Sequence, residues 1–373
     1  MRYYLFLLLL ALPVTADSLI DQQLPDFYQQ LKRQTYPLSW QSGNFTDITT
    51  WRSTGRQALR QALLWPDEPV EFAPELLKSE KRTGYSAQLW SIQLTAQSRV
   101  SVMVLQPDNT KPAPAVLLLH DHGARFDIGK EKWIKPFAGD ARSASAQQWA
   151  DKYFSGHFIG DALAQQGYLV VAADTFGWSE RGPIEFSAQQ ALASNMFLLG
   201  RSLAGMAAYE DLRLVQFVKQ LPQADSSRLA AVGFSMGAYK AWQLAALTDD
   251  IKAAVAVSWL NDYQHLMQPG NNILRGQSSF YMLHPGIAGE LDIPDMASLA
   301  APKAMLFING GKDGLMPLAG IEASYRKLQQ VWRDYGAAQK LSTKIYPEFG
   351  HEFNAEQQQQ VYDWLSTQLL ENN

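Results

Sequence analysis

The chain of 373 residues is 47% hydrophobic and 18% charged, with a net charge of −4 and no cysteine. A chain of this length can bury a large core, so its stability needs neither disulfides nor a structural metal. The lack of cysteine excludes a disulfide framework, a thiolate zinc site, an iron–sulfur cluster and a cysteine nucleophile. Without a basic surplus we expect no nucleic-acid partner. The composition predicts a globular protein.

The N-terminal segment 1–16 reads MRYYLFLLLLALPVTA. One positive charge precedes an apolar run from Leu5 to Leu12, and the small residues Val14 and Ala16 follow. This pattern is typical of a secretory signal peptide that is cleaved before Asp17. The run is shorter than the roughly 20 apolar residues that span a bilayer. We therefore expect an exported protein, periplasmic or secreted, with no membrane partner after cleavage.

Residues 17–83 carry apolar side chains at helical spacing, which predicts a helical N-terminal extension packed on the main domain. From residue 84 to 373, short apolar runs alternate with helical patterns. Two mixed segments, Tyr85–Thr95 and Arg99–Gln106, predict an antiparallel hairpin at a sheet edge. The remaining expected strands are Ala115–Leu119, Tyr168–Ala173, Arg228–Phe234, Ile251–Val257, Ala304–Ile308 and Ser342–Tyr346. The expected helices are Phe154–Gln166, Ser187–Leu221, Ala238–Leu247, Pro317–Tyr335 and Ala355–Leu370.

Nearly continuous apolar runs of this length fit strands that are buried on both faces of a parallel sheet. The alternation predicts an α/β fold with a doubly wound, mostly parallel sheet. Two long segments, Ala124–Lys152 and Asn261–Ala300, interrupt the alternation after strands. We expect both to lie above the carboxyl ends of the strands, where ligands bind in open α/β sheets.

One motif combines an apolar strand with the sequence Gly-Phe-Ser-Met-Gly at Gly233–Gly237. Glycines two positions before and after a serine allow a strained strand-to-helix turn that pushes the hydroxyl out of the sheet. The helix that follows aims its N-terminal dipole and free N–H groups at that hydroxyl. The strand before the motif and the helix after it predict that Ser235 is a nucleophile rather than a helix cap.

A serine hydroxyl needs a base, and the base needs an orienting acid. Both should follow the serine in the chain, each just beyond a strand. Asp313 lies in the loop after Ala304–Ile308, and His351 lies between the last strand and the last helix. We predict Asp313 as the acid and His351 as the base. Asp262, which also follows a strand, is the alternative acid.

An oxyanion hole needs two backbone N–H groups, one of which should be that of Met236, directly after the nucleophile. The other should come from the loop His120-Asp121-His122-Gly123, with the N–H of His122 or Gly123 as the donor. The same loop allows a metal reading, since His-x-His can bind zinc. No third ligand follows at a recognisable spacing, so we expect no metal and assign His120 as a buried, hydrogen-bonded loop residue.

Taken together, these residues resemble the α/β-hydrolase superfamily and, within it, the dienelactone hydrolase and acetyl xylan esterase-like branch. The resemblance covers residues 84–370 and rests on LLLHDHG, DTFGWSERG, GFSMGA, NGGKDGLMP and FGHEF, in that order. It implies Ser235 as the nucleophile, Asp313 as the acid and His351 as the base, with oxyanion donors from Met236 and His122. His120-Asp121 departs from the His-Gly that is common in that family, and this affects the second donor.

The expected function is therefore that of a serine hydrolase that cleaves carboxylic esters without a cofactor. An acylated carbohydrate is the preferred substrate, because Trp133, Trp178 and Trp259 could stack on a sugar ring. The basic residues Arg125, Lys130 and Lys132 suggest an acidic sugar. Two alternatives stay open: a serine peptidase resembling the prolyl oligopeptidase catalytic domain, and a non-catalytic binding protein on the same fold. The short N-terminal segment has no room for the propeller of such peptidases.

Overall fold

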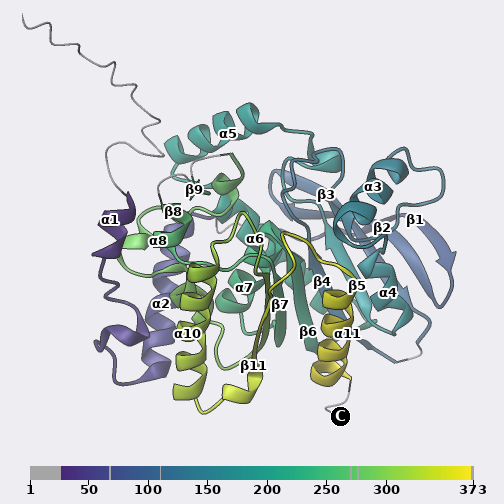
Figure 1. Cartoon of the computed structure of the whole chain (residues 1–373). Coiled ribbons are helices and arrows are strands. Elements are labelled where there is room, and N and C mark those ends of the chain that lie inside the picture. Colours follow the sequence, from purple (N-terminus) through teal and green to yellow (C-terminus); the bar gives the residue numbers. More distant parts are fainter. Residues whose placement is uncertain (1–26, 67–68, 110, 269–270, 275–276, 371–373) are drawn as a thin grey trace, which may run out of the picture.

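A mixed sheet of nine strands runs through the molecule (Figure 1). The structure, a computed structural model, describes residues 27–370 except 67–68, 110, 269–270 and 275–276. The strand order in the main sheet is β1-β2-β3-β5-β4-β6-β7-β10-β11, and a two-stranded ribbon, β8-β9, lies apart from it. The strands are β1 (Glu75–Arg82), β2 (Tyr85–Thr95), β3 (Ser98–Pro107), β4 (Ala113–Leu119), β5 (Leu169–Ala173), β6 (Ala224–Phe234), β7 (Ala253–Val257), β8 (Met267–Gln268), β9 (Asn271–Asn272), β10 (Ala304–Gly310) and β11 (Leu341–Tyr346). The predicted signal segment, residues 1–16, lies outside the described residues.

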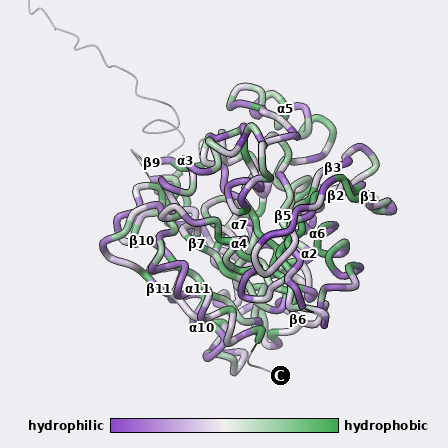
Figure 2. The backbone as a smooth tube through the Cα atoms, turned by 90° about the vertical axis from the view of Figure 1, so that its right-hand side faces the viewer, coloured by the Kyte–Doolittle hydropathy of each residue, from purple (hydrophilic) through white to green (hydrophobic). Residues whose placement is uncertain are grey.

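The central strands are parallel and buried on both faces. β5, β4, β6, β7, β10 and β11 pair in parallel, whereas β1, β2, β3 and β5 pair antiparallel. Alternate residues of one strand enter opposite cores: Leu117 joins one cluster and Leu118 the other. Figure 2 shows the hydrophobic backbone segments gathered at the centre of the molecule. The prediction of a doubly wound, mostly parallel α/β sheet is confirmed.

Helices cover both faces of this sheet. They are α1 (Phe27–Lys32), α2 (Ile48–Leu63), α3 (Ser143–Tyr153), α4 (Ile159–Gln165), α5 (Phe186–Leu198), α6 (Leu203–Gln220), α7 (Met236–Leu247), α8 (Tyr263–Leu266), α9 (Ile293–Ser298), α10 (Leu318–Asp334) and α11 (Ala355–Leu369). Apolar residues of α2, α6, α7, α9 and α10 form the core on one face, and those of α4 and α11 form the core on the other. The sheet is therefore enclosed on both sides, as its apolar strands require.

The expected long helix Ser187–Leu221 is two helices. α5 ends before Gly200, whose φ of 68° is left-handed, and α6 begins after Ser202. The Ser202 side chain accepts a hydrogen bond from the N–H of Gly205 and donates one to the carbonyl of Leu63. A left-handed glycine followed by a serine cap ends one helix and starts another. In Figure 1, α5 lies apart at the top of the molecule.

The sheet begins earlier than the sequence predicts. β1 pairs antiparallel with β2 over Glu75–Arg82, inside the segment expected to be a helical extension. Its sequence ELLKSEKR is mostly exposed and charged, which is typical of an edge strand that must not pair with another chain. An apolar-run criterion misses such a strand because almost none of it is buried. The predicted hairpin of β2 and β3 is present.

The N-terminal helices pack on the same core. Trp51 of α2 is buried, and its indole N–H donates to the carbonyl of Leu38. Arg52 and Arg56, on the same helix, form ion pairs with Asp249 in the loop before β7. α2 also contacts α6, α7 and α9. Figure 1 shows α1 and α2 beside α10, at one side of the sheet.

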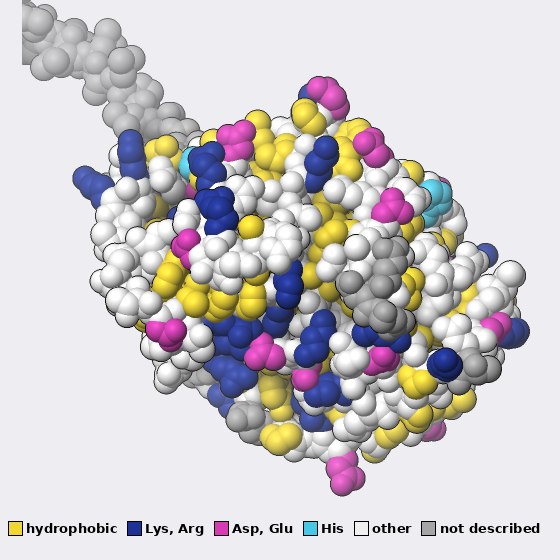
Figure 3. Space-filling view, turned by 90° about the horizontal axis from the view of Figure 1, so that it is seen from below, with side chains coloured by type: hydrophobic (Ala, Val, Ile, Leu, Met, Phe, Trp, Pro, Cys, Tyr) yellow, Lys and Arg dark blue, Asp and Glu magenta, His cyan; other side chains and the backbone are white. Residues whose placement is uncertain are grey.

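The lower end of the molecule carries side chains of both charges. Figure 3 shows Lys and Arg side chains lying next to Asp and Glu on this face. Ion pairs occur at the loops that precede the parallel strands, such as the pair between Lys219 of α6 and Asp250 before β7. Parallel strands end at the opposite edge of the sheet, so the loops after β4, β6, β10 and β11 lie together there.

Candidate active site

Ser235 lies on a strained turn between β6 and α7. Its φ of 55° and ψ of −124° are unusual for a residue with a side chain. The turn is close-packed: a Cβ on Gly233 would lie 1.9 Å from the carbonyl oxygen of Gly237, and one on Gly237 would lie 1.8 Å from that of Leu119. Both glycines are therefore required for the turn. The N–H of Ser235 donates to the carbonyl of Val257, which ties the turn to β7.

Ser235, His351 and Asp313 form one hydrogen-bonded chain. Nε2 of His351 lies 2.8 Å from Oγ of Ser235, and Nδ1 lies 2.7 Å from Oδ2 of Asp313. A carboxylate only accepts hydrogen bonds, so Nδ1 carries the proton and Nε2 is free to accept one from the serine hydroxyl. The structure thus brings the three predicted side chains together in the expected order.

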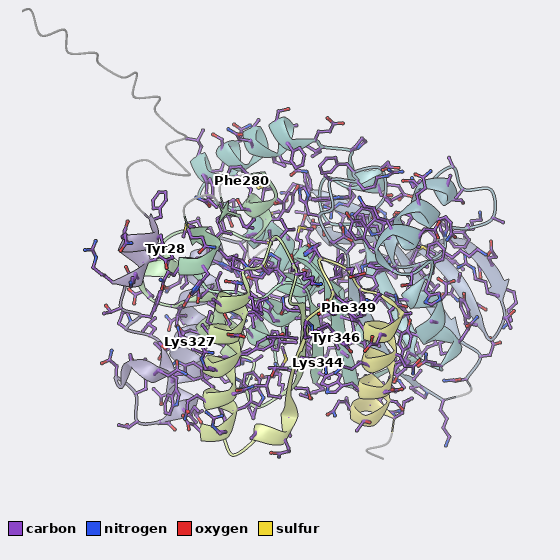
Figure 4. All side chains as sticks on the ribbon, viewed as in Figure 1. Tyr28, Phe280, Lys327, Lys344, Tyr346 and Phe349 are labelled. Atoms are coloured by element: carbon purple, nitrogen blue, oxygen red, sulfur yellow. The ribbon has the colours of Figure 1, made fainter. Side chains whose placement is uncertain are left out.

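The loop after β10 holds Asp313 in place. Its second carboxylate oxygen accepts a hydrogen bond from the N–H of Leu315 at 2.8 Å, and its side chain is fully buried. The loop after β11 packs against this loop, because the N–H of Lys312 donates to the carbonyl of Phe349. Figure 4 shows Tyr346 at the end of β11 and Phe349 just beyond it; their rings stack with centroids 5.2 Å apart. This packing fixes the approach of the chain to His351.

Asp262, the alternative acid, lies elsewhere. Its carboxylate contacts Nδ1 of His265 at 2.7 Å and caps the start of α8. It therefore has a partner histidine that is not His351. The structure pairs His351 with Asp313 instead.

Three backbone N–H groups border the serine without an acceptor among the described residues: those of Met236, His122 and Gly123. Met236 is the first residue of α7, so its N–H cannot bond within the helix. The imidazole of His122 is held by other side chains. Its Nε2 lies 3.1 Å from the amide oxygen of Gln189, and the ring stacks on Phe186. Burial lowers the pKa of His122 to about 4. His122 therefore offers its backbone rather than its ring.

Comparison with known proteins identifies the family. The Abhydrolase family model matches residues 25–368, which is most of the chain. The chain belongs to the Abhydrolase family. A protein of Bacillus subtilis (strain 168) named "Putative hydrolase YtaP" is 29% identical over 265 residues, covering 71% of this chain and 82% of that protein.

Solved structures share the fold. A "putative acetyl xylan esterase" from Bacteroides fragilis NCTC 9343 superposes with a TM-score of 0.67 at 20% identity, covering 86% of this chain and 81% of that one. A glucuronoyl esterase from Solibacter usitatus gives a TM-score of 0.66 at 14% identity, covering 90% and 97%. The resemblance to α/β-hydrolases is confirmed by the family match, and the acetyl xylan and glucuronoyl esterase structures share the fold.

In this Abhydrolase family member, a cavity of about 460 Å³ opens onto Ser235 and His351. Most of its wall is apolar or aromatic, including Trp149, Tyr153, Phe186, Trp259, Met282 and Leu315. Its further polar groups include Asp121, Asn272 and Ser278. Both long segments contribute, Trp149 from the first and Met282 from the second, as their position after strands predicts. Sequence analysis missed Trp149 and Tyr153, although Trp149 lies three residues after the buried Ala146 on α3, which is helical spacing.

The tryptophans and basic residues singled out from the sequence are mostly structural. Trp133 and Trp178 are fully buried, and only Trp259 of the three reaches the cavity. Lys130 and Lys132 are buried as well and contact carboxylates of the protein. The expectation that they recognise an acidic sugar is therefore wrong, because their charges are already neutralised inside the fold.

Arg125, the third basic residue, also has partners within the chain. Its guanidinium donates to Ser145 and Gln148 and forms an ion pair with Asp127. It does not line the cavity. No lysine or arginine in the described ranges lines the cavity.

Both histidines of the His-x-His pattern contact protein groups. Among the described residues, no group of three or more His, Asp or Glu side chains is arranged to hold an ion. Nε2 of His120 instead accepts a hydrogen bond from the N–H of Thr175 at 2.9 Å. Its assignment as a buried, hydrogen-bonded residue agrees with this contact.

Within the described residues, no helix is long and apolar enough to cross a bilayer.

Proposed function

We propose that this protein is a serine hydrolase that cleaves carboxylic esters, with a carbohydrate ester as its substrate. The observation that carries the proposal is the continuous hydrogen-bonded chain from Ser235 through His351 to Asp313, which opens onto a cavity. A binding protein would have no need for this complete set. The carbohydrate ester follows from the acetyl xylan and glucuronoyl esterases among structures of the same fold.

The mechanism is acyl transfer in two steps. Oγ of Ser235 attacks the ester carbonyl carbon while its proton passes to Nε2 of His351. The resulting oxyanion accepts hydrogen bonds from Met236 N–H and from the His122–Gly123 segment. His351 then gives its proton to the departing alkoxide, which leaves as the alcohol. A water molecule repeats the attack on the acyl-enzyme, and the acid is released with Ser235 restored.

Asp313 acts on the histidine and not on the substrate. Its buried carboxylate keeps the proton on Nδ1 and stabilises the imidazolium that forms when His351 takes the serine proton. No cofactor enters any step. The catalytic groups all belong to residues 84–373, which we propose as the catalytic domain, with 17–83 as its N-terminal extension. The last part of that extension, β1 (Glu75–Arg82), forms the edge strand of the domain's sheet.

We further propose that the protein is exported, because residues 1–16 combine a charged start, an apolar run and a small-residue cleavage site. Expression of the full chain in a bacterial host tests this. We expect a mature protein in the periplasm or medium that begins at Asp17, as read by mass spectrometry. Recovery of the full-length chain in the cytoplasm alone would contradict export.

The decisive experiment is a hydrolysis panel with the wild type and the Ser235→Ala variant. The panel contains short acyl esters of p-nitrophenol, acetylated xylan, a uronate methyl ester and a peptide amide. We expect ester turnover that the variant lacks, together with fluorophosphonate labelling of Ser235 in the wild type alone. Release of amine without ester turnover would favour a peptidase. The absence of both turnover and labelling would leave a binding protein.

A further inference from the structure

The buried ammonium of Lys132 holds the loop His120–Gly123, which precedes the long segment Ala124–Lys152. Nζ of Lys132 contacts the carbonyl oxygen of Asp121 at 2.9 Å and that of His122 at 3.1 Å. Its third contact is Oδ2 of Asp121, at 3.1 Å. An ammonium has three N–H donors, so these acceptors use all of them. Lys132 is 0% exposed and does not border the cavity.

Each of the two carbonyls also has a second donor. Nδ1 of His120 lies 2.8 Å from the carbonyl of Asp121. Nε2 of the same ring accepts from the N–H of Thr175, so the proton is on Nδ1, and burial lowers the pKa of His120 well below its usual range. The indole N–H of Trp178 donates to the carbonyl of His122 at 3.1 Å. Both carbonyls are therefore fixed in direction.

Fixing a carbonyl also fixes the N–H of the next residue. Both peptide bonds are trans, since the cis bonds of the described residues precede Pro183 and Pro302. In a trans peptide the N–H points opposite to the C=O. With the carbonyls of Asp121 and His122 turned toward Lys132, the N–H groups of His122 and Gly123 point away from it. These are the N–H groups without an acceptor at the border of the cavity.

We propose that Lys132 is a positioning residue for the oxyanion hole; the proposal rests on the function proposed above. Lys132 does not touch the substrate. It orients two successive peptide groups so that both N–H donors converge on the oxyanion. A cation bonded to the carbonyl also polarises the peptide and strengthens its N–H as a donor. The Asp121 carboxylate, 3.1 Å from the Lys132 ammonium, balances its charge.

The chain offers a matched control in the same 3₁₀ turn. Lys130 is also buried and contacts Oδ2 of Asp174 at 2.7 Å, but it does not contact the carbonyls of Asp121 and His122. The test compares two charge-neutral double variants, Lys132→Met with Asp121→Asn and Lys130→Met with Asp174→Asn. Each double variant leaves the net charge unchanged and avoids the unpaired buried charge that a single substitution would create. Glu131, which also contacts Lys130 at 3.0 Å, keeps Arg142 at 3.8 Å and the N–H of Gly129 at 3.0 Å in the Lys130 pair.

Measurements are kcat, KM and the affinity for an alkylboronic acid, whose serine adduct is a tetrahedral anion. For the Lys132 pair we expect kcat about 10²-fold lower, as for the loss of one oxyanion donor. KM should change little, and boronic acid affinity should fall with kcat. The Lys130 pair should lower the melting temperature and leave kcat within about threefold, because Lys130 bonds Asp174 and not the carbonyls of Asp121 and His122. Equal losses of kcat in both pairs, or none in the Lys132 pair, would overturn the proposal.

A milder variant decides the question if the Lys132 pair does not fold. Trp178→Phe keeps the aromatic packing and removes one donor from the His122 carbonyl. We expect kcat to fall several-fold with KM unchanged, and an unchanged kcat would overturn the proposal. A wild type without ester turnover or fluorophosphonate labelling would reject the proposed function itself, before any Lys132 variant is compared.

Discussion

The carboxylate of Asp313 accepts a hydrogen bond from Nδ1 of His351 at 2.7 Å while its own side chain is fully buried. The imidazole is 19% exposed, so the acid is sealed behind the base. In this setting the carboxylate is kept from water and interacts with the imidazolium more strongly than it would at the surface. The carboxylate and the imidazole are therefore closely coupled in the fold.

Replacement of the acid should therefore abolish most activity without unfolding the protein. In Asp313→Asn the amide can donate to Nδ1, which favours the tautomer that blocks Nε2 from accepting the serine proton. We expect kcat to fall by about 10³–10⁴-fold, with KM and the melting temperature close to wild type. Asp262→Asn is the matched control, because Asp262 contacts His265 and not His351. A large loss of kcat in the control and a small one in Asp313→Asn would reverse the assignment.

The nucleophile turn should not tolerate a methyl group. In Gly237→Ala the new Cβ would lie 1.8 Å from the carbonyl oxygen of Leu119, and backbone cannot move aside cheaply. We expect a loss of at least about 1–3 kcal/mol in the free energy of unfolding, with hydrolysis lost as Ser235 moves. Gly289→Ala, where nothing lies within 4 Å of the added Cβ, should stay within about 0.5 kcal/mol of wild type. Urea unfolding of the wild type and the two variants measures the free energies of unfolding, and an ester assay measures hydrolysis. Equal stabilities of the two variants would refute the close packing.

The link between α2 and the main domain should depend on pH. Hydrogen bonds from Arg56 hold the pKa of Asp249 below its usual range, with Arg52 and Lys303 also nearby. A carboxyl whose folded-state pKa is lowered stabilises the fold above its unfolded pKa of about 4, and this is lost as pH falls. Asp249→Asn should therefore melt earlier than wild type at pH 7, by a modest amount because the carboxylate is largely exposed. The gap should narrow at pH 3, and a gap that widens in acid would contradict this.

The cavity should prefer uncharged esters. No lysine or arginine of the described residues lines it, and the carboxylate of Asp121 at its border is already paired with Lys132. An anionic substrate would lose hydration without gaining a partner. We expect kcat/KM for p-nitrophenyl butyrate to exceed that for p-nitrophenyl hemisuccinate by about tenfold or more, equivalent to about 1.4 kcal/mol. Equal values would show that the free carboxylate finds a cation that the lining residues do not provide.

Local patterns predicted the elements whose burial is uniform. The apolar runs of β4, β6, β7 and β10 were located to within a few residues because both of their faces are buried. β1 was missed because it is an exposed, charged edge, and the α5–α6 break was missed because helical spacing continues past Gly200. The acidic-sugar hypothesis failed for a related reason: a sequence does not reveal that Lys130 and Lys132 face carboxylates inside the core.

The amino-acid sequence by itself determined the parallel α/β sheet, the turn that carries Ser235 and the candidates Asp313 and His351. Each of these depends on neighbours in the chain: a strand before, a helix or turn after, and glycines at set spacing. Only the tertiary structure decided which acid meets the histidine, which aromatic side chains line the cavity, and that Lys132 holds the loop opposite the serine. Those contacts join residues far apart in the chain, and the energy of a buried charge or a fixed peptide depends on what surrounds it in space.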